Sequence, residues 1–403
     1  MDTFIPEVDL DLNDEEAKLD PTKIYASLQE RYPIFRLRSG NLALCRHEDV
    51  RLALRDWQTF SEGVSTEARG EWWMPEDCRH EVFLISQSPP QHEKYRSLIN
   101  KNYIPAAING FIPEIENKIS EILIRLPVGH EFDFVELVSL PVASMVSSLA
   151  TGVEDNPYHS ETIRKWAFLS ELNAPDSPEA HQQAVIAETR KLNLIFKNLI
   201  ESRQAQPRTK DLVSLLLRST VDSKELTYET ISGALGLFLS AGFMTSAQLL
   251  SATMRQLVAR PVIRQQLIED RSLVPALIEE TLRYVGPTHS VMRLTTKPVT
   301  LHDAMIPKGA RVHLILGAAN RDPRQFEHPN DFILGRENIK THVAFGYGVH
   351  VCIGAALARL VSKVVITRIL DFGENFNWSL ISEEWNSTLY TRGLEILKIR
   401  FEK

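Results

Sequence analysis

The segment that begins at Phe345, FGYGVHVCIGAALAR, surrounds a single cysteine, Cys352, with a histidine and three glycines. A lone cysteine is most often a small buried hydrophobe. Here Gly346 and Gly348 precede the cysteine and Gly354 follows it, which favours tight turns or a close approach of the backbone. Strong helix formers come next, and a thiol at the start of a helix has a lowered pKa because the macrodipole and unpaired N–H groups favour the thiolate. The segment therefore predicts a thiolate held ready as a nucleophile or a metal ligand.

The cysteine count limits which metal or redox chemistry is open to the chain. The three cysteines, Cys45, Cys78 and Cys352, are odd in number and far apart. This pattern excludes a disulfide framework and a CxxC zinc site. A metal at Cys352 would therefore sit within a cofactor that needs one protein ligand. A mononuclear site of His342, His350 and Cys352 is a further alternative, although it lacks a carboxylate partner and the usual zinc spacing.

The composition indicates a large globular protein. The chain has 403 residues, of which 43% are hydrophobic, and its formal net charge of -7 argues against a nucleic-acid partner. No linker, repeat or low-complexity segment divides it, so we expect one domain over residues 1–403. We expect the N-terminal segment of about 20 residues to be flexible. The acidic N-terminus does not resemble a signal peptide and no apolar run predicts a membrane span, so we expect a cytoplasmic protein.

Local patterns predict how the first two thirds of the chain are organised. A helix from Pro21 leads into a hairpin with its turn at Ser39-Gly40-Asn41, and a second helix covers HEDVRLALRD. The segment from Thr59 to Pro90 is irregular and carries several aromatic residues, so it is either a ligand lid or a loop packed on the core. The segment from Gln91 to Arg260 is mostly helical by periodicity.

The longest apolar element runs from Thr227, a plausible N-cap, to the residue before Pro261. It is apolar on nearly all sides, which predicts a central buried helix. Its segment AGFMTS, residues 241–246, contains a glycine and two hydroxyls that lower helix propensity. This segment is either a small-residue packing site or a local helix distortion that lines a pocket.

The last third combines helices, short strands and a long loop. Two helices follow Pro261, the second covering SLVPALIEETLRYV, and strand-like segments follow in VMRLTT and VTLHDAMIPKGARVHLIL. A long loop, ANRDPRQFEHPNDFILGREN, then leads to the glycine-rich segment. Together the patterns predict a mainly α fold with small β-sheets.

The glycine-rich segment resembles the haem-ligand loop of the cytochromes P450. The family's pattern of a phenylalanine, two glycines, a histidine or arginine, the cysteine and a further glycine is filled by Phe345, Gly346, Gly348, His350, Cys352 and Gly354. Further matches follow in the family's order: His92 and Arg96 in SPPQHEKYR, Glu280 and Arg283 in EETLR, then Arg293, and Arg336 in NDFILGR. The resemblance runs from about Pro21 to the C-terminus. It implies the cytochrome P450 fold in a single large domain, and the soluble bacterial type is the most similar.

The resemblance implies one haem b, iron protoporphyrin IX, with Cys352 as the axial thiolate and the metal ligand. The implied cofactor contacts are Cys352, His92, Arg96, Ala241, Arg293, Phe345, Gly346, His350 and Gly354. His92 and Arg96 are four residues apart, so on a helix they share a face, where they would meet the haem propionates. The implied structural group, buried beneath the haem, is Glu280, Arg283 and Arg336.

The chain departs from the family in its central helix. The family usually has an acid before a threonine, and both residues help to deliver protons. Here Met244 takes the place of the acid before Thr245, and a thioether cannot relay a proton. One hypothesis is an ordinary monooxygenase in which Thr245, Ser246 and the substrate's own hydroxyls carry protons. The other is oxidative coupling, cyclisation or desaturation of a phenol or indole type without oxygen insertion.

By the same resemblance, the substrate is a mid-sized hydrophobic or aromatic small molecule, of the kind found in secondary metabolism and antibiotic biosynthesis. The implied pocket residues are Trp72, Trp73, Phe83, Ile85, Leu237, Gly242, Met244, Thr288, His289, Ser290, Met292, Leu389 and Tyr390. His289 is either a substrate anchor or a structural histidine. The aromatic-rich loop argues against a remaining alternative, a haem sensor or electron carrier without enzymatic activity.

No flavin or nicotinamide fingerprint occurs in the sequence, so electrons must come from a separate partner. The resemblance implies a ferredoxin and a ferredoxin reductase that pass electrons from NAD(P)H. Candidate basic contacts for this partner are Lys94, Lys101, Arg359 and Lys363. Nothing in the sequence demands more than a monomer, and no membrane partner is expected.

Overall fold

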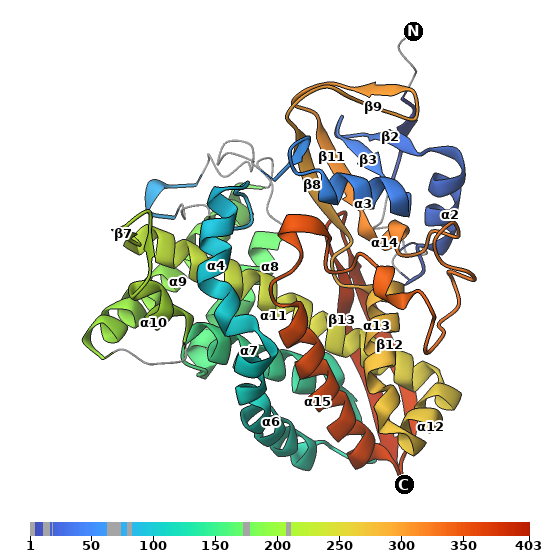
Figure 1. Cartoon of the computed structure of the whole chain (residues 1–403). Coiled ribbons are helices and arrows are strands. Elements are labelled where there is room, and N and C mark those ends of the chain that lie inside the picture. Colours follow the sequence, from blue (N-terminus) through green and yellow to red (C-terminus); the bar gives the residue numbers. More distant parts are fainter. Residues whose placement is uncertain are drawn as a thin grey trace. The chain divides into compact units, whose positions relative to one another are not determined.

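The computed structural model describes residues 5–10, 17, 19–62, 74–78, 83–171, 178–206 and 211–403 (Figure 1). The chain forms two compact units, which are described separately below. Unit 1 comprises Met1–Glu62, Ile119–Ser139 and Gln248–Lys403, and unit 2 comprises Gly63–Lys118 and Leu140–Ala247. The expected single domain stays a prediction. The expected flexible N-terminal segment lies largely outside the described residues.

The main sheet of unit 1 has six strands in the order β1-β2-β3-β11-β8-β4. These strands are β1 (Glu7–Val8), β2 (Ile34–Leu37), β3 (Leu42–Leu44), β4 (Phe60–Ser61), β8 (Ser290–Thr295) and β11 (Arg311–Ile315). The β2–β3 hairpin turns at Gly40, whose φ of +82° favours glycine. The sheet thus pairs strands from opposite ends of the sequence, because β11 runs parallel to β3.

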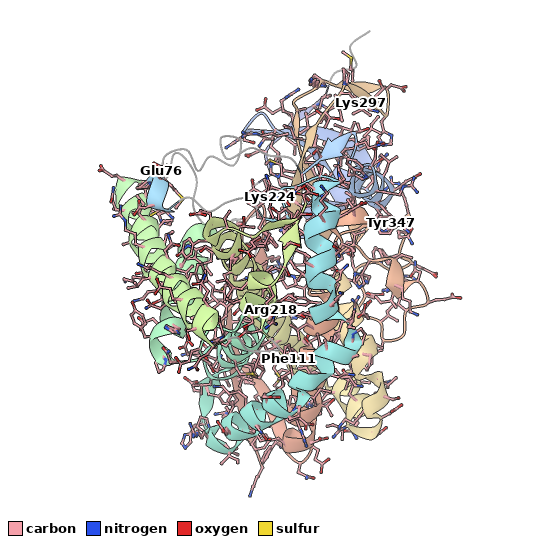
Figure 2. All side chains as sticks on the ribbon, turned by 60° about the vertical axis from the view of Figure 1, so that its left-hand side comes forward. Glu76, Phe111, Arg218, Lys224, Lys297 and Tyr347 are labelled. Atoms are coloured by element: carbon pink, nitrogen blue, oxygen red, sulfur yellow. The ribbon has the colours of Figure 1, made fainter. Side chains whose placement is uncertain are left out.

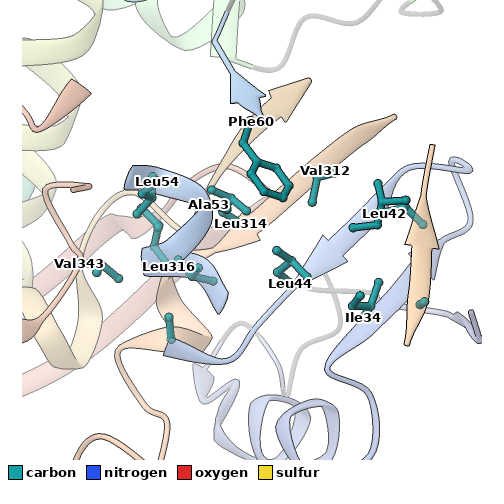
Figure 3. Packing of buried hydrophobic residues seen from close by; sticks show 14 residues of the cluster. Ile34, Leu42, Leu44, Ala53, Leu54, Phe60, Val312, Leu314, Leu316 and Val343 are labelled. Atoms are coloured by element: carbon teal, nitrogen blue, oxygen red, sulfur yellow. The ribbon is translucent and has the colours of Figure 1, made fainter. Parts of the chain in front are cut away.

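The core of this sheet is a cluster of aliphatic side chains and one phenylalanine (Figure 3). Leu44 of β3 and Leu314 of β11 are fully buried in it, and Phe60 extends into it from β4. Helix α3 (His47–Arg55) adds Ala53 and Leu54 to this cluster. This cluster therefore holds α3 against the main sheet.

Two smaller sheets complete the β structure of unit 1. They are the hairpin of β9 (Val299–Leu301) and β10 (Ala304–Ile306), and a sheet of β5 (Glu131–Asp133), β12 (Asn377–Ser387) and β13 (Arg392–Glu402). The helical elements of unit 1 besides α3 are α2 (Thr22–Arg31), the π-helix η4 (Val135–Ser139), α12 (Pro261–Glu269), η5 (Arg271–Leu273), α13 (Val274–Val285), α14 (Leu316–Ala319), η6 (Ile339–Thr341), η7 (Gly348–His350) and α15 (Ala355–Gly373).

Unit 2 is almost entirely helical. Its elements are η2 (Glu76–Cys78), α4 (Gln91–Tyr103), α5 (Pro105–Ile108), η3 (Asn109–Phe111), α7 (Leu140–Thr151), α8 (Pro157–Glu171), α9 (Glu179–Ala205), α10 (Leu212–Leu217) and the hairpin of β6 (Thr220–Val221) and β7 (Lys224–Glu225). Two helices belong partly to each unit, α6 (Ile112–Arg125) and α11 (Tyr228–Ala259). The described residues therefore confirm the expected mainly α fold with small sheets.

Helix α11 is the predicted long apolar element. The Thr227 hydroxyl accepts a hydrogen bond from the Thr230 N–H (3.2 Å), as an N-cap does. Of the helices that the structure describes, this is the one whose length and composition would suffice to cross a membrane, although 56% of its most apolar window is buried. Burial is less complete than predicted, because Ala241 is exposed and four of the five residues that follow it are half-buried.

Candidate functional site

The cysteine loop has the backbone that its glycines predict. Gly346 and Gly348 have φ values of +70° and +77°, which other residues rarely adopt. A Cβ on Gly348 would lie 2.7 Å from the Leu54 carbonyl oxygen of α3, so this position also needs glycine for close approach. The Cys352 N–H donates to the Phe345 carbonyl oxygen (2.9 Å), which closes the loop just before α15.

The thiol of Cys352 is exposed, whereas Cys45 and Cys78 are buried. Burial raises the pKa of Cys45 to about 12, which keeps that thiol protonated. The backbone around Cys352 also leaves space. Among the residues that the structure describes, a Cβ on Gly354 would meet only the cysteine sulfur, at 3.8 Å, and one on Gly346 only the His350 carbonyl oxygen, at 3.9 Å. Cys352 is therefore not a core residue, and its surroundings leave space for a flat group.

Glu279 of α13 connects the cysteine loop to α15. Its carboxylate accepts from Arg359 Nε (2.6 Å) and Nη2 (2.9 Å) and lies 3.0 Å from His342 Nε2. Hydrogen bonds from both partners hold the pKa of Glu279 at about 2, although burial acts in the opposite direction. The Arg359 guanidinium also lies over the Phe345 ring, 4.5 Å from its centroid. Sequence analysis missed Glu279, although the adjacent acid of EETLR was recognised.

The three residues expected to be structural come together in unit 1. Arg283 donates to both carboxylate oxygens of Glu280 (2.7 and 2.9 Å), and both side chains are fully buried. Arg336 approaches the same carboxylate at 3.4 Å. The two arginines also donate to backbone carbonyls of the long loop that precedes the cysteine segment, including that of Asp331. The group thus ties this loop to α13.

Arg293, an expected propionate contact, lies on β8 with its side chain 3% exposed. It forms an ion pair with Glu62, which follows β4 and was not recognised in the sequence. Its Nη1 also donates to the Met292 carbonyl oxygen (2.9 Å). No local sequence pattern links the two residues, because they meet only through the pairing of β4 with β8.

His289 contributes its ring to the core of unit 1. Its side chain is 1% exposed, its Nε2 is hydrogen bonded to the Tyr25 hydroxyl, and the two rings meet edge to face. Burial lowers the pKa of His289 to about 3, so the ring stays neutral. Ser290 is engaged as well, because its hydroxyl donates to the Leu389 carbonyl oxygen (2.6 Å). Of the two roles left open for His289, these contacts are those of a structural histidine.

The other expected pocket residues of unit 1 are more accessible. Tyr390 is 45% exposed, and Thr288, Met292 and Leu389 are half-buried. His350, an expected propionate contact, lies in η7 and is also half-buried. The four pocket residues come from β8, from the segment before it and from the turn between β12 and β13.

Helix α4 in unit 2 carries both expected propionate residues of that region. His92 is buried near its start and Arg96 is half-buried one turn later, as the i, i+4 spacing predicted. Burial lowers the pKa of His92 to about 4, and the nearby Arg96 charge adds to this effect. The neutral ring is therefore favoured until an anion is added.

The segment 241–246 is α-helical throughout, so the possible local distortion does not interrupt α11. The Thr245 hydroxyl donates to the Ala241 carbonyl oxygen (2.6 Å). A Cβ on Gly242 would meet no atom of the described residues within 4 Å, and Ala241 is exposed. Leu237, Met244 and Ser246 are half-buried. This stretch of α11 thus presents the small Ala241 and Gly242 and the Thr245 hydroxyl on an incompletely buried part of the helix.

The aromatic segment before α4 is partly described. Phe83 is buried and packs edge to face on Tyr95 of α4, with ring centroids 5.0 Å apart, whereas Ile85 is 49% exposed. Phe83 is thus a core residue of unit 2. Trp72 and Trp73 lie outside the described residues.

Two of the four expected partner-docking cations are already paired. Lys94 forms an ion pair with Asp222 (2.7 Å), and Arg359 is bound to Glu279. Lys101 and Lys363 are exposed. Helix α3 carries two further cations: Arg51, which donates to the Tyr347 hydroxyl (3.0 Å), and the exposed Arg55. Tyr347, labelled in Figure 2, belongs to the cysteine loop.

The mononuclear metal alternative gains no support from the geometry. Within the described ranges, no three His, Cys, Asp or Glu side chains are grouped to hold a metal ion. His342 contacts Glu279 instead.

Comparisons with known proteins agree with this geometry. The family description "Cytochrome P450" matches residues 14–399. Cytochrome P450 107B1 of Saccharopolyspora erythraea is 32% identical over 393 residues, which cover 93% of this chain and 94% of that protein. The 6-deoxyerythronolide B hydroxylase of the same organism is 27% identical, covering 97% of this chain and 98% of its own.

The fold is similar to solved structures over its whole length. A cytochrome P450 from Chondromyces apiculatus, CYP109Q5, matches with a TM-score of 0.86 and 28% identity, covering 99% of each chain. The fold predicted from the sequence is therefore confirmed. The family match spans nearly all of the sequence, and the exposed cysteine lies on the loop that the resemblance named. The chain belongs to the cytochrome P450 family of monooxygenases.

Proposed function

We propose that this protein is a haem-thiolate monooxygenase that hydroxylates or epoxidises a mid-sized hydrophobic or aromatic molecule of bacterial secondary metabolism. The observation that carries the proposal is the exposed Cys352 on its glycine loop, while the other two cysteines are buried. Haem b bound through this thiolate would supply the activation of dioxygen. The small-molecule class is supported by the relative named as a 6-deoxyerythronolide B hydroxylase.

The residues of each unit fit a haem. In unit 1, the thiol lies beside Gly346 and Gly354, where an added Cβ would meet almost nothing. In unit 2, Ala241 is exposed and Gly242 faces open space. A planar macrocycle needs such small residues on its faces, and its carboxylates need cations. Arg293, Arg96, His92 and His350 are the proposed propionate donors.

Charge and proton roles follow from these residues. A propionate near His92 would oppose the burial and the Arg96 charge that lower the pKa of its ring. Thr245 and Ser246 are proposed to move protons on α11. Met244 cannot relay a proton, because its thioether is only a weak acceptor. Oxidative coupling, cyclisation or desaturation without oxygen insertion is therefore the second candidate function.

The proposed reductant is NAD(P)H, acting through a ferredoxin reductase and a ferredoxin. The proposed contacts for the ferredoxin are the exposed Lys101 and Lys363 and, from α3, Arg51 and Arg55. We further propose that the protein is a cytoplasmic monomer.

Optical titration of the purified ferric protein tests this proposal. Terpenoid, fatty, macrolide, phenolic and indolic compounds are added in turn while the Soret band is followed. A low-spin to high-spin shift with one class identifies the substrate class and supplies the compound for product analysis. The Cys352→Ser variant should lose the thiolate-type Soret band of the ferrous carbonyl complex, whereas Cys78→Ala should retain it. A wild-type protein without a Soret band after haem supplementation refutes the proposal.

A further inference from the structure

The carboxylate that follows β4, Glu62, forms an ion pair with Arg293 of β8. The sheet register explains this pair, because Ser61 pairs with Leu294 in antiparallel strands and the next residue therefore lies opposite Arg293. The Glu62 side chain is 16% exposed and that of Arg293 is 3% exposed. The pair is thus built into the sheet rather than formed by flexible surface side chains.

Arg293 retains donors for a second anion. Its Nη1 contacts Glu62 Oε1 and donates to the Met292 carbonyl oxygen. A guanidinium has five N–H donors arranged in a planar fork. Both of these contacts use Nη1. Within the described part of the chain, this leaves Nε and Nη2 to donate to a propionate. One cation would then lie between two carboxylates.

Burial and the partner's charge act in opposite directions on the pKa of each member of the pair. Burial raises the pKa of Glu62 to about 7, although the Arg293 charge and hydrogen bond act in the opposite direction. Burial also lowers the pKa of Arg293, which Glu62 opposes. Among the described residues, Arg293 is the one charged group that acts on Glu62.

We propose that Glu62 and a haem propionate share Arg293, so that Glu62 weakens the hold of the protein on haem and makes it depend on pH. The inference rests on the proposed function, because it needs haem in the site. Two carboxylates on one guanidinium repel each other, so the ionised Glu62 reduces the attraction that Arg293 exerts on the propionate.

The direction of the pH dependence follows from linkage. A nearby propionate raises the pKa of Glu62 above its value of about 7 without that neighbour. Haem binding is then accompanied by proton uptake, so affinity is highest below pH 7 and falls as the pH rises above it. His92 and His350 are also proposed propionate contacts, so the informative quantity is the difference between wild type and a Glu62 variant.

Transfer of haem from the purified holoprotein to excess apomyoglobin measures this hold. Glu62→Gln should release haem roughly tenfold more slowly than wild type at pH 8, since one shared charge is removed. The two proteins should release haem at the same rate at pH 6, where wild-type Glu62 is protonated. Glu62→Asp keeps the charge and should stay pH-dependent. Glu161→Gln, in an exposed ion pair with Lys165, is the control and should match wild type.

Reconstitution with protohaem dimethyl ester separates the propionate effect from a general one. This cofactor has no carboxylate, so Glu62→Gln and wild type should release it equally fast. A Glu62→Gln rate equal to or faster than wild type at pH 8, or equal slowing with the ester, overturns the inference. If Glu62→Gln fails to fold, a Glu62→Asp protein without pH-dependent release overturns it instead. A wild-type protein that holds no haem refutes the proposed function.

Discussion

Met244 occupies the position at which the family usually has an acid. Its side chain is half-buried on α11. The next residue, Thr245, donates its hydroxyl hydrogen bond to the Ala241 carbonyl oxygen. Replacing Met244 with Asp or Glu restores a group that can relay a proton. If the protein is an ordinary monooxygenase, product formed per NAD(P)H consumed should rise severalfold. Met244→Leu is the control and should leave this ratio unchanged. A flat or falling ratio would favour coupling without oxygen insertion.

Glu280 neutralises two buried arginines. Changing it to Gln leaves Arg283 and Arg336 without their carboxylate, which should destabilise the protein by about 3–5 kcal/mol. Urea unfolding of the haem-loaded protein, followed by far-UV circular dichroism, should show a lower midpoint with an unchanged slope. The exposed Glu161, paired with Lys165, provides a matched control, since its change to Gln should leave the midpoint where it is. An unaltered midpoint for the Glu280 variant would refute its structural role.

At the scale of elements, α3 and the cysteine loop touch at Gly348. An alanine there would adopt an unfavourable positive φ and place its Cβ 2.7 Å from the Leu54 carbonyl oxygen. Gly309→Ala is the matched control, because Gly309 has a φ of +81° but a Cβ there would meet no atom of the described part of the chain within 4 Å. Both variants should lose about 1–2 kcal/mol from the backbone alone. Only Gly348→Ala should also shift the ferrous carbonyl Soret band away from its thiolate form, and equal spectra would show that α3 does not position the loop.

The sequence predicts elements well where the pattern is local. The ends of α11, the β2–β3 turn and the entry into α15 follow from caps, glycines and periodicity. Contacts across elements are not written in any local pattern. Tyr25 and His289 are 264 residues apart, yet their side chains are hydrogen bonded to each other.

The same reason explains which site residues were missed. Glu62 and Glu279 have ordinary surface-like sequence surroundings, and only the register of β4 with β8 and the packing of α13 near α15 reveal their partners. The residues of the cysteine loop and the Glu280 group were recognised because their spacing resembles a family pattern. Resemblance therefore identified residues that belong to a sequence motif. The fold was needed to find residues whose partners are distant in the sequence.

For the whole molecule, buried histidines make stability depend on pH. Burial lowers the pKa of His289 to about 3 and that of His313 to about 4. Both lie below the unfolded value of about 6.5, so the unfolded chain binds more protons and stability is lost as the pH falls from 6.5 towards 4. Each group contributes about 1.4 kcal/mol per pH unit within that window.

Urea unfolding at pH 7, 6 and 5 measures this loss. His313→Gln should reduce the fall in unfolding free energy between pH 6 and pH 5, because one proton fewer is taken up on unfolding. His130, which is exposed, serves as the control, and His130→Gln should keep the wild-type pH dependence. A wild-type unfolding free energy that does not fall between pH 7 and pH 5 would contradict the prediction.

The main sheet has a consequence for synthesis on the ribosome. β3 ends at Leu44, but its parallel neighbour β11 begins at Arg311, so the hydrogen-bonding edge of β3 stays open until most of the chain has been made. An unpaired strand edge invites association with other chains. We expect nascent chains that stop before β11 to need chaperones and to aggregate without them. Expression temperature and rate would then govern the yield of this protein more strongly than the stability of its finished fold.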